Sequence, residues 1–172
     1  MTGALRGLIH VINNSAVHNT ALYLLGNLPG FPPMVQTIHI LGISCVMGSI
    51  VLIDLKVLGL ALPSQSVPEL VRRLMPWTWW ALLFVMLSGL TLFVARPGRY
   101  LVNPVFGIKF ALLIPAVVLA AIFQRLVRAN PGPAQPGGWT QRAIALVSLL
   151  LWIGVVMAGR WIAYADYLFP AE

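Results

Sequence analysis

Three ionisable side chains lie inside long apolar runs of the sequence, where together they could bind a metal and an anion. His39 stands in "PPMVQTIHILG", Lys109 in "NPVFGIKFALL" and Arg160 in "VVMAGRWIAY". Ionisable groups are costly to bury in apolar spans, so they are the first candidates for a functional site. An imidazole can ligate a metal ion, and cationic side chains can bind carboxylate or phosphate groups.

The composition of the chain indicates a membrane protein. Its 172 residues are 59% hydrophobic and 9% charged, with a mean hydropathy of +0.89, whereas about a quarter of the residues of a soluble domain are charged. The net charge of +7 comes from basic residues near the ends of apolar runs, where they meet lipid headgroups. We therefore expect the lipid bilayer as a partner and no nucleic acid.

The sequence predicts an all-α integral membrane protein that forms a single domain over residues 1–172. Four apolar segments are each long enough to cross about 30 Å of hydrocarbon as a helix. An amphipathic interfacial helix is expected before them over residues 3–28, broken near Asn13–Ser15 where polar residues interrupt its apolar face. The expected transmembrane helices of this four-helix bundle are 33–62, 76–95, 104–128 and 140–169.

Counted from these expected helix ends, the candidate side chains lie at a similar depth in the membrane. At 1.5 Å per residue, His39, Lys109 and Arg160 lie roughly 8–14 Å below the same ends of the spans. Ser88 reaches a similar depth, and Tyr164 shares the helical face of Arg160. Two buried cations without a carboxylate at their level are costly unless Lys109 is neutral, both snorkel to the surface or an anionic ligand lies between them.

Haem b fits this arrangement. His39 would be an axial ligand of the iron, and Lys109 and Arg160, with Tyr164 beside them, would meet the propionates. The alternative is structural: a hydrogen-bonded packing histidine and two snorkelling cations. His10 and His18 in the N-terminal segment are either exposed polar residues or, if that segment folds over the bundle, the source of a second iron ligand, such as His18.

Asp54 lies near the opposite end of the first span, about 22 Å along the helix from His39. We expect a structural ion pair between its carboxylate and an arginine at that end, and a proton-relay role is the alternative. The arginines within reach of that level are Arg72, Arg73, Arg125 and Arg128. Because the loops at this end carry more basic residues, it is expected to be cytoplasmic, with both termini periplasmic.

Three segments carry a resemblance to a known family: "TIHILGISCVMGSIVLIDLKVLGL", "NPVFGIKFALL" and "LLLWIGVVMAGRWIAY". They resemble an uncharacterised family of four-helix proteins of the bacterial inner membrane. More distantly, His39 and Lys109 are similar to the pattern of the copper-resistance-D-like membrane domain and of the four-helix membrane protoporphyrinogen oxidase. In the oxidase family, a histidine on an early span and a lysine on a later one mark the haem or porphyrin site, and the resemblance implies that role here.

The leading functional hypothesis is a b-type haem-binding membrane protein in electron transfer, with quinone as a membrane partner, acting alone or with other membrane subunits. A second hypothesis is a non-enzymatic auxiliary or anchor subunit of a membrane complex, in which the polar level is a packing network. The third is a transporter for copper or another small solute. A haem spectrum distinguishes the first hypothesis from the other two.

Overall fold

The computed structural model describes residues 3–129 and 138–164, and this part of the chain is entirely helical apart from its short connections. The elements in chain order are α1 (Gly3–Asn13), α2 (Ala16–Asn27), α3 (Phe31–Leu58), α4 (Val67–Ala95), α5 (Pro97–Leu101), α6 (Pro104–Ala129), α7 (Trp139–Trp161) and the 3₁₀ turn η1 (Ile162–Tyr164).

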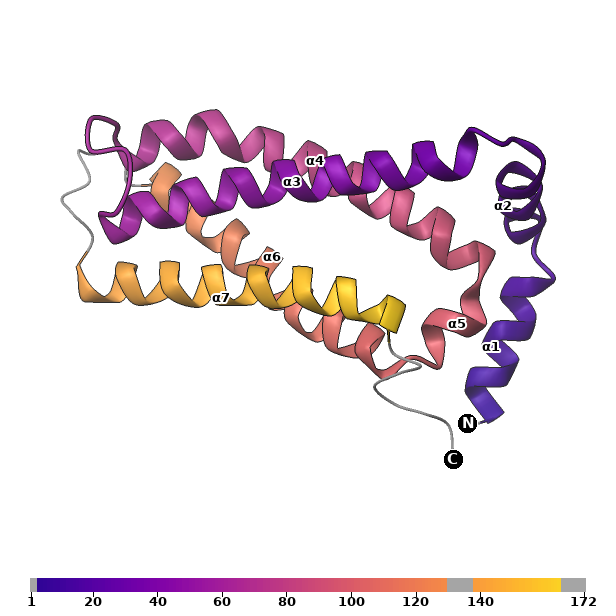
Figure 1. Ribbon diagram of the computed structural model, residues 1–172. Helices are drawn as coiled ribbons and strands as arrows, with labels where there is room; N and C mark the ends of the chain where they lie inside the picture. The colour runs from indigo at the N-terminus through magenta and orange to yellow at the C-terminus, as the bar shows by residue number, and fades with distance from the viewer. Residues whose placement is uncertain (1–2, 130–137, 165–172) are drawn as a thin grey trace.

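Four long helices form a bundle, as Figure 1 shows. Helix α3 packs chiefly against α4 and also against α7, and α6 packs chiefly against α7. All four are long and apolar enough to cross a membrane. The prediction of an all-α, four-span membrane bundle is therefore confirmed, and the chain is a multi-pass membrane protein.

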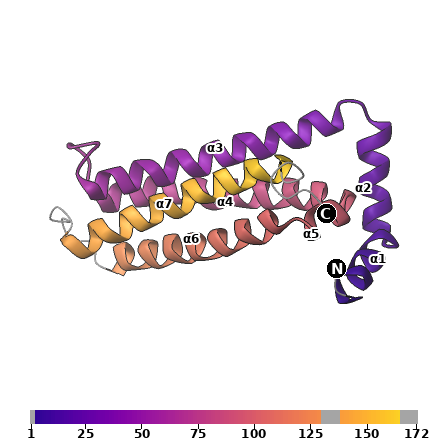
Figure 2. The ribbon, with the colours of Figure 1, turned by 60° about the horizontal axis from the view of Figure 1, so that its bottom comes forward.

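Helices α1 and α2 lie across one end of this bundle, next to α5 (Figures 1 and 2). The predicted break between them is confirmed, because α2 has its own N-cap at Ser15. The Ser15 hydroxyl accepts a hydrogen bond from the His18 backbone at 3.2 Å and donates one to the Ile12 carbonyl at 2.7 Å. Helix α2 packs against α4, with Ala21 buried, and α1 packs against α5.

The first long helix ends earlier than the sequence predicts. Helix α3 stops at Leu58 because Gly59 adopts the left-handed conformation, with φ at 80°. The Leu60 amide then turns back to the Leu55 carbonyl at 2.9 Å, as in a Schellman cap. The predicted extension of this span to residue 62 is therefore wrong.

The second long helix begins nine residues before the predicted start at residue 76. Ser66 caps α4 by accepting a hydrogen bond from the Glu69 amide at 3.4 Å, and Pro68 lies in the first turn, where no donor is lost. The helix then continues through Pro76, which the sequence analysis took as a boundary. Membrane helices tolerate such prolines, because neighbouring groups can satisfy the freed carbonyl.

The third and fourth predicted spans begin close to the observed helix starts. Asn103 precedes α6 and accepts a hydrogen bond from the Val105 amide at 2.9 Å, which is the cap expected from the "NP" pair. Helix α7 ends at Trp161 and continues as the η1 turn. The predicted continuation of the α-helix through residue 164 is therefore wrong, and the remainder of the prediction, to residue 169, lies outside the described residues.

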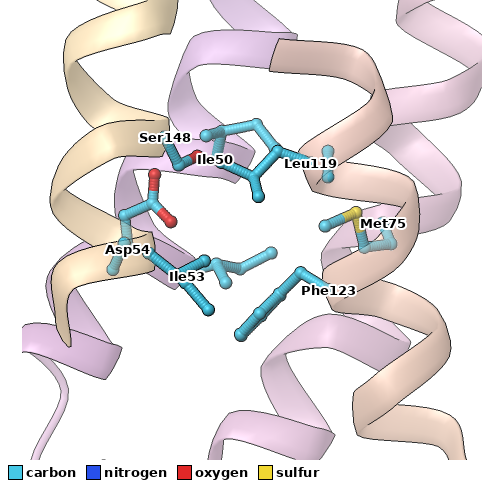
Figure 3. Close-up of a pocket in the computed structure, with 10 residues that line it drawn as sticks. Ile50, Ile53, Asp54, Met75, Leu119, Phe123 and Ser148 are labelled. Carbon is cyan, nitrogen blue, oxygen red and sulfur yellow. The ribbon is translucent and has the colours of Figure 1, made fainter. Parts of the chain in front are cut away.

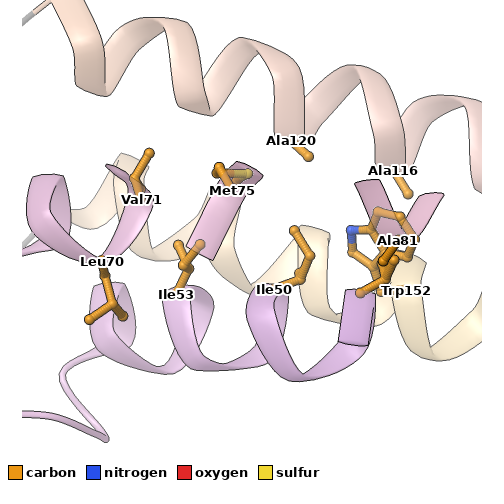
Figure 4. Close-up of a cluster of buried hydrophobic side chains, with 10 residues drawn as sticks. Ile50, Ile53, Leu70, Val71, Met75, Ala81, Ala116, Ala120 and Trp152 are labelled. Carbon is orange, nitrogen blue, oxygen red and sulfur yellow. The ribbon is translucent and has the colours of Figure 1, made fainter. Parts of the chain in front are cut away.

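The main hydrophobic core lies toward the end of the bundle where α3 connects to α4 (Figure 4). Near the α1–α2 end, the described residues contribute a much smaller cluster, formed by Val105 and Ala158 with Ile162 against them. The half of the bundle that holds His39 therefore has the thinner hydrophobic core. The buried members of the main cluster are Val46, Ile50, Ile53, Leu70, Val71, Met75, Ala81, Ala116, Ala120 and Trp152.

Candidate cofactor site

His39 lies on α3 where this helix faces α4. It stands eight residues after the first residue of α3, or about 12 Å along the axis. Its Nδ1 atom is 2.9 Å from the Ser88 hydroxyl oxygen on α4. Gly89 makes room for the ring, because a Cβ atom at that position would be 3.2 Å from Cε1 of His39.

The hydrogen bonds of Ser88 define the tautomer of His39. The Ser88 hydroxyl donates its one proton to the Phe84 carbonyl, at 2.6 Å, so its oxygen must accept from the imidazole. Nδ1 of His39 therefore carries a proton, and Nε2 of the neutral ring carries a lone pair. The imidazole also interacts with the Val85 backbone on α4, one turn before Gly89. This is the arrangement of a histidine that can ligate a metal through Nε2.

Lys109 on α6 approaches the same level of the bundle. Its side chain is half-buried, and a Cβ atom on Gly159 of α7 would lie 3.8 Å from Nζ. Lys109 and His39 are close enough to interact electrostatically. Among the described residues, no hydrogen bond or ion pair reaches the ammonium group. The structure thus brings Lys109 and His39 together and leaves the Lys109 ammonium without a counter-charge in the part of the chain that it describes.

Arg160 lies closer to a helix end than the sequence analysis assumed, because α7 ends at Trp161 rather than near residue 169. Its side chain is exposed and donates a hydrogen bond to the Tyr164 hydroxyl at 3.3 Å. The guanidinium also lies 5.4 Å from the centre of the Tyr164 ring. Arg160 and Tyr164 therefore form a pair of their own, and Gly159, the residue before Arg160, lies next to the end of the Lys109 side chain.

His18 is anchored to the end of α4 above the same region. Its Nδ1 atom is 2.7 Å from the Val94 carbonyl oxygen, which can only accept, so Nδ1 donates and Nε2 keeps its lone pair. Val94 is six residues after Ser88, about 9 Å along α4. The N-terminal segment packs against α4 and α5 at this end of the bundle, which is the alternative that the sequence left open for His18. His10, by contrast, is exposed and contacts Asn14 in the turn directly after α1.

An aromatic cluster that the sequence analysis missed borders this region. Phe93 and Phe106 are stacked, with ring centres 5.6 Å apart, and Tyr100 lies within 6.1 Å of Phe93. Phe110 meets Phe106 edge-on at 4.9 Å. The spacing of Phe106 and Phe110, one helical turn apart around Lys109, was visible in the sequence. Their association with α4 and α5 depends on the tertiary structure.

The predicted ion pair of Asp54 is wrong. Asp54 is 6% exposed, and among the described residues no cation lies within ion-pair distance of its carboxylate, whose Oδ2 atom has no hydrogen-bond partner. The carboxyl group faces Ser148 on α7 inside the bundle (Figure 3). The arginines proposed as partners are all exposed on the outer surfaces of their helices. They are Arg72, Arg73, Arg125 and Arg128.

Comparison with known proteins places the chain in a family. A family model described as a family of unknown function, DUF6644, matches residues 16–165. The chain belongs to the DUF6644 family. The match runs from the first residue of α2 past the end of η1, so it includes every residue of the candidate site. The prediction of an uncharacterised family is confirmed.

No curated protein and no solved structure matches the chain. The more distant resemblance to the copper-resistance-D-like domain and the protoporphyrinogen oxidase family stays a prediction. The geometry around His39 is therefore the feature of this DUF6644 member that bears most directly on its function.

Proposed function

We propose that this DUF6644 protein binds haem b within its bundle and transfers electrons in the membrane. The observation that supports the proposal is the hydrogen bond from Nδ1 of His39 to Ser88, which leaves Nε2 free for iron. Metal-bound histidines commonly donate their other ring N–H to a neighbouring acceptor, which fixes the ring and its tautomer. His18 has the same arrangement through the Val94 carbonyl and is the proposed second ligand.

The charges at the site favour a cofactor that carries carboxylates. The ammonium of Lys109 is half-buried near His39 and has no anionic partner in the described part of the chain. A haem propionate would supply that charge, and the exposed guanidinium of Arg160 could bind the second propionate beside Tyr164. The stacked rings of Phe93 and Phe106 add apolar aromatic surroundings that suit a macrocycle.

A haem site would also require only one or two metal ligands from the protein. In residues 3–129 and 138–164, no three His, Cys, Asp or Glu side chains come together as a metal site. A porphyrin supplies four nitrogen atoms itself, so the protein needs only one or two axial ligands. Bound haem would provide a one-electron iron couple, and a membrane quinone is the proposed partner for electron exchange.

An absorption spectrum of the purified protein tests this function. We expect a Soret band and a pyridine haemochrome spectrum of b-type haem, at about one haem per chain, after expression with an adequate haem supply. Reduction by a quinol should shift the visible bands, whereas a redox-inactive lipid should not. A folded protein without haem under these conditions would contradict the proposal.

The second candidate function is an auxiliary or anchor subunit. Outside the four long helices, the described chain holds only α1, α2, α5, η1 and short connections, so it offers little structure outside the membrane. In that case the bond between His39 and Ser88 would serve packing alone. A colourless protein that co-purifies with a larger membrane complex would support this candidate.

The orientation in the membrane is a further part of the proposal. We expect both termini in the periplasm of a bacterial inner membrane, and the connections after α3 and after α6 in the cytoplasm. Reporter fusions at Ser64 and at Gly138 should show cytoplasmic activity, and a fusion at the N-terminus periplasmic activity. The reverse pattern would place His39 in the cytoplasmic half. The basic residues toward the expected cytoplasmic end are Lys56, Arg72, Arg73, Arg125, Arg128 and Arg142.

A further inference from the structure

Asp54 lines a small cavity at the end of the bundle opposite His39. The cavity volume is about 10 Å³, and α3, α4, α6 and α7 all contribute to its wall (Figure 3). Apart from Asp54 and Ser148, the lining is apolar, with Met75 and Phe123 among its larger side chains. A volume of this size is at the lower limit for holding one water molecule.

The Asp54 carboxyl group is buried, and no charged partner reaches it from residues 3–129 or 138–164. It is 6% exposed, and its Oδ2 atom has no hydrogen-bond partner among the described residues. The other polar group of the lining is the Ser148 hydroxyl, which faces the carboxyl from α7. An isolated carboxylate in such apolar surroundings is costly, whereas a neutral carboxylic acid can donate a hydrogen bond to a water molecule.

The charged groups of the helices around the cavity point elsewhere. Lys56, two residues after Asp54, donates a hydrogen bond from its ammonium group to the Leu62 carbonyl at 2.8 Å. The cavity wall holds no titratable side chain other than Asp54 in the part of the chain that the structure describes. The neighbouring arginines are exposed: Arg72 and Arg73 on α4, Arg125 and Arg128 on α6, and Arg142 on α7.

We propose that Asp54, with Ser148 and one water molecule in this cavity, forms a reversible proton-binding site. On protonation an O–H bond forms at the carboxylate, and the resulting acid donates to the water while Ser148 donates to the other carboxyl oxygen. The proton comes from the aqueous phase beyond the α3–α4 connection and returns to it. Asp54 is four residues from the end of α3, about 6 Å along the axis, so the path is short.

This site is separate from the proposed haem site and does not depend on it. Asp54 and His39 are fifteen residues apart on α3, about 22 Å along its axis. Their separation puts the two sites in opposite halves of the bundle. The chain would therefore exchange protons at one end whether or not it carries a redox cofactor at the other.

Infrared spectroscopy of the full-length protein in lipid nanodiscs tests this proposal. A protonated carboxylic acid gives a C=O stretching band that a carboxylate lacks, and the chain has only four acidic side chains. We expect this band at neutral pH, with a shift to lower frequency in D₂O, and its reversible loss as the pH is raised. Asp54→Asn should remove the band, because an amide cannot bind the proton.

The control is Glu69→Gln, since Glu69 is exposed at the start of α4 and should leave the band unchanged. Ser148→Ala keeps the carboxyl group but removes its hydroxyl partner, so the band should remain and move in frequency. This variant also provides a result if Asp54→Asn fails to fold. No band at neutral pH, a band that survives in Asp54→Asn, or a band that persists unchanged at every pH would each overturn the proposal.

Discussion

The His39→Ala variant is expected to fold and insert but to contain almost no haem. A methyl group cannot ligate iron, so the axial bond through Nε2 is lost together with the hydrogen bond to Ser88. The Soret absorbance per chain, measured on purified protein and checked by pyridine haemochrome, should fall to near the background. Ser88→Ala should have a smaller effect, because loss of the group that accepts the other ring N–H of a metal-bound histidine weakens metal retention by about 10- to 100-fold.

His10→Ala is the matched control for this experiment. His10 is exposed, and its ring contacts Asn14 in the turn directly after α1, so its loss should leave the spectrum unchanged. His18→Ala tests the second ligand, and we expect a change from six-coordinate low-spin to five-coordinate high-spin haem. If His39→Ala kept its haem with an unaltered spectrum, His39 would be a packing residue and the proposed function would lose its basis.

The sequence predicted the architecture well because apolar length and proline signals act locally. For α6, the length of the apolar run and the cap at Asn103 predicted a helix over 104–128. The observed helix starts at the same residue and ends one residue later. The predicted helix boundaries are wrong where one residue type is compatible with two positions in a helix. Pro76 resembles a helix start, yet Ser66 supplies the actual cap of α4, so the proline lies inside the helix.

The candidate site was predicted only in part, because the depth of a residue along a helix does not define the direction in which its side chain points. Counting residues brought His39 and Lys109 to a common level, and the structure places them close enough to interact. The same count placed Arg160 too deep, because it used a helix end at residue 169. The pairing of Arg160 with Tyr164 on its own helix depends on side-chain rotamers, which the sequence does not specify.

The expectation for Asp54 failed for a related reason. Several arginines lie at its level in the sequence, and charge alone suggested a pair. In the structure these arginines are exposed, as long cationic side chains near helix ends tend to be, while Asp54 is buried and faces Ser148. The depth of a residue can be counted from the sequence, but its side of the helix depends on how the four helices pack.

The packing of α3 on α4 controls the His39 site through Gly42. Gly42 is buried three residues after His39, and Val85 is three residues before Ser88, so the two contacts are adjacent. A Cβ atom at Gly42 would lie 2.6 Å from Cγ2 of Val85 and 3.3 Å from the Ala81 carbonyl. Val85 cannot easily rotate away, because a β-branched side chain has one preferred rotamer in a helix. The two helices would therefore have to separate.

We expect Gly42→Ala to destabilise the protein by about 1–3 kcal/mol, the usual cost of overpacking a well-packed contact. Gly48→Ala is the control on the same helix. Gly48 has open space where its Cβ atom would be, and alanine is the better helix former by up to about 1 kcal/mol, so this variant should be as stable as the wild type or more so. Unfolding in detergent, followed by circular dichroism against increasing SDS, measures both variants. Because separation of α3 from α4 would also lengthen the hydrogen bond between His39 and Ser88, Gly42→Ala should retain haem less well than Gly48→Ala.

Equal stability of the two variants would show that α4 does not approach α3 closely at Gly42. It would also contradict the inference that this close contact holds the His39 imidazole in place.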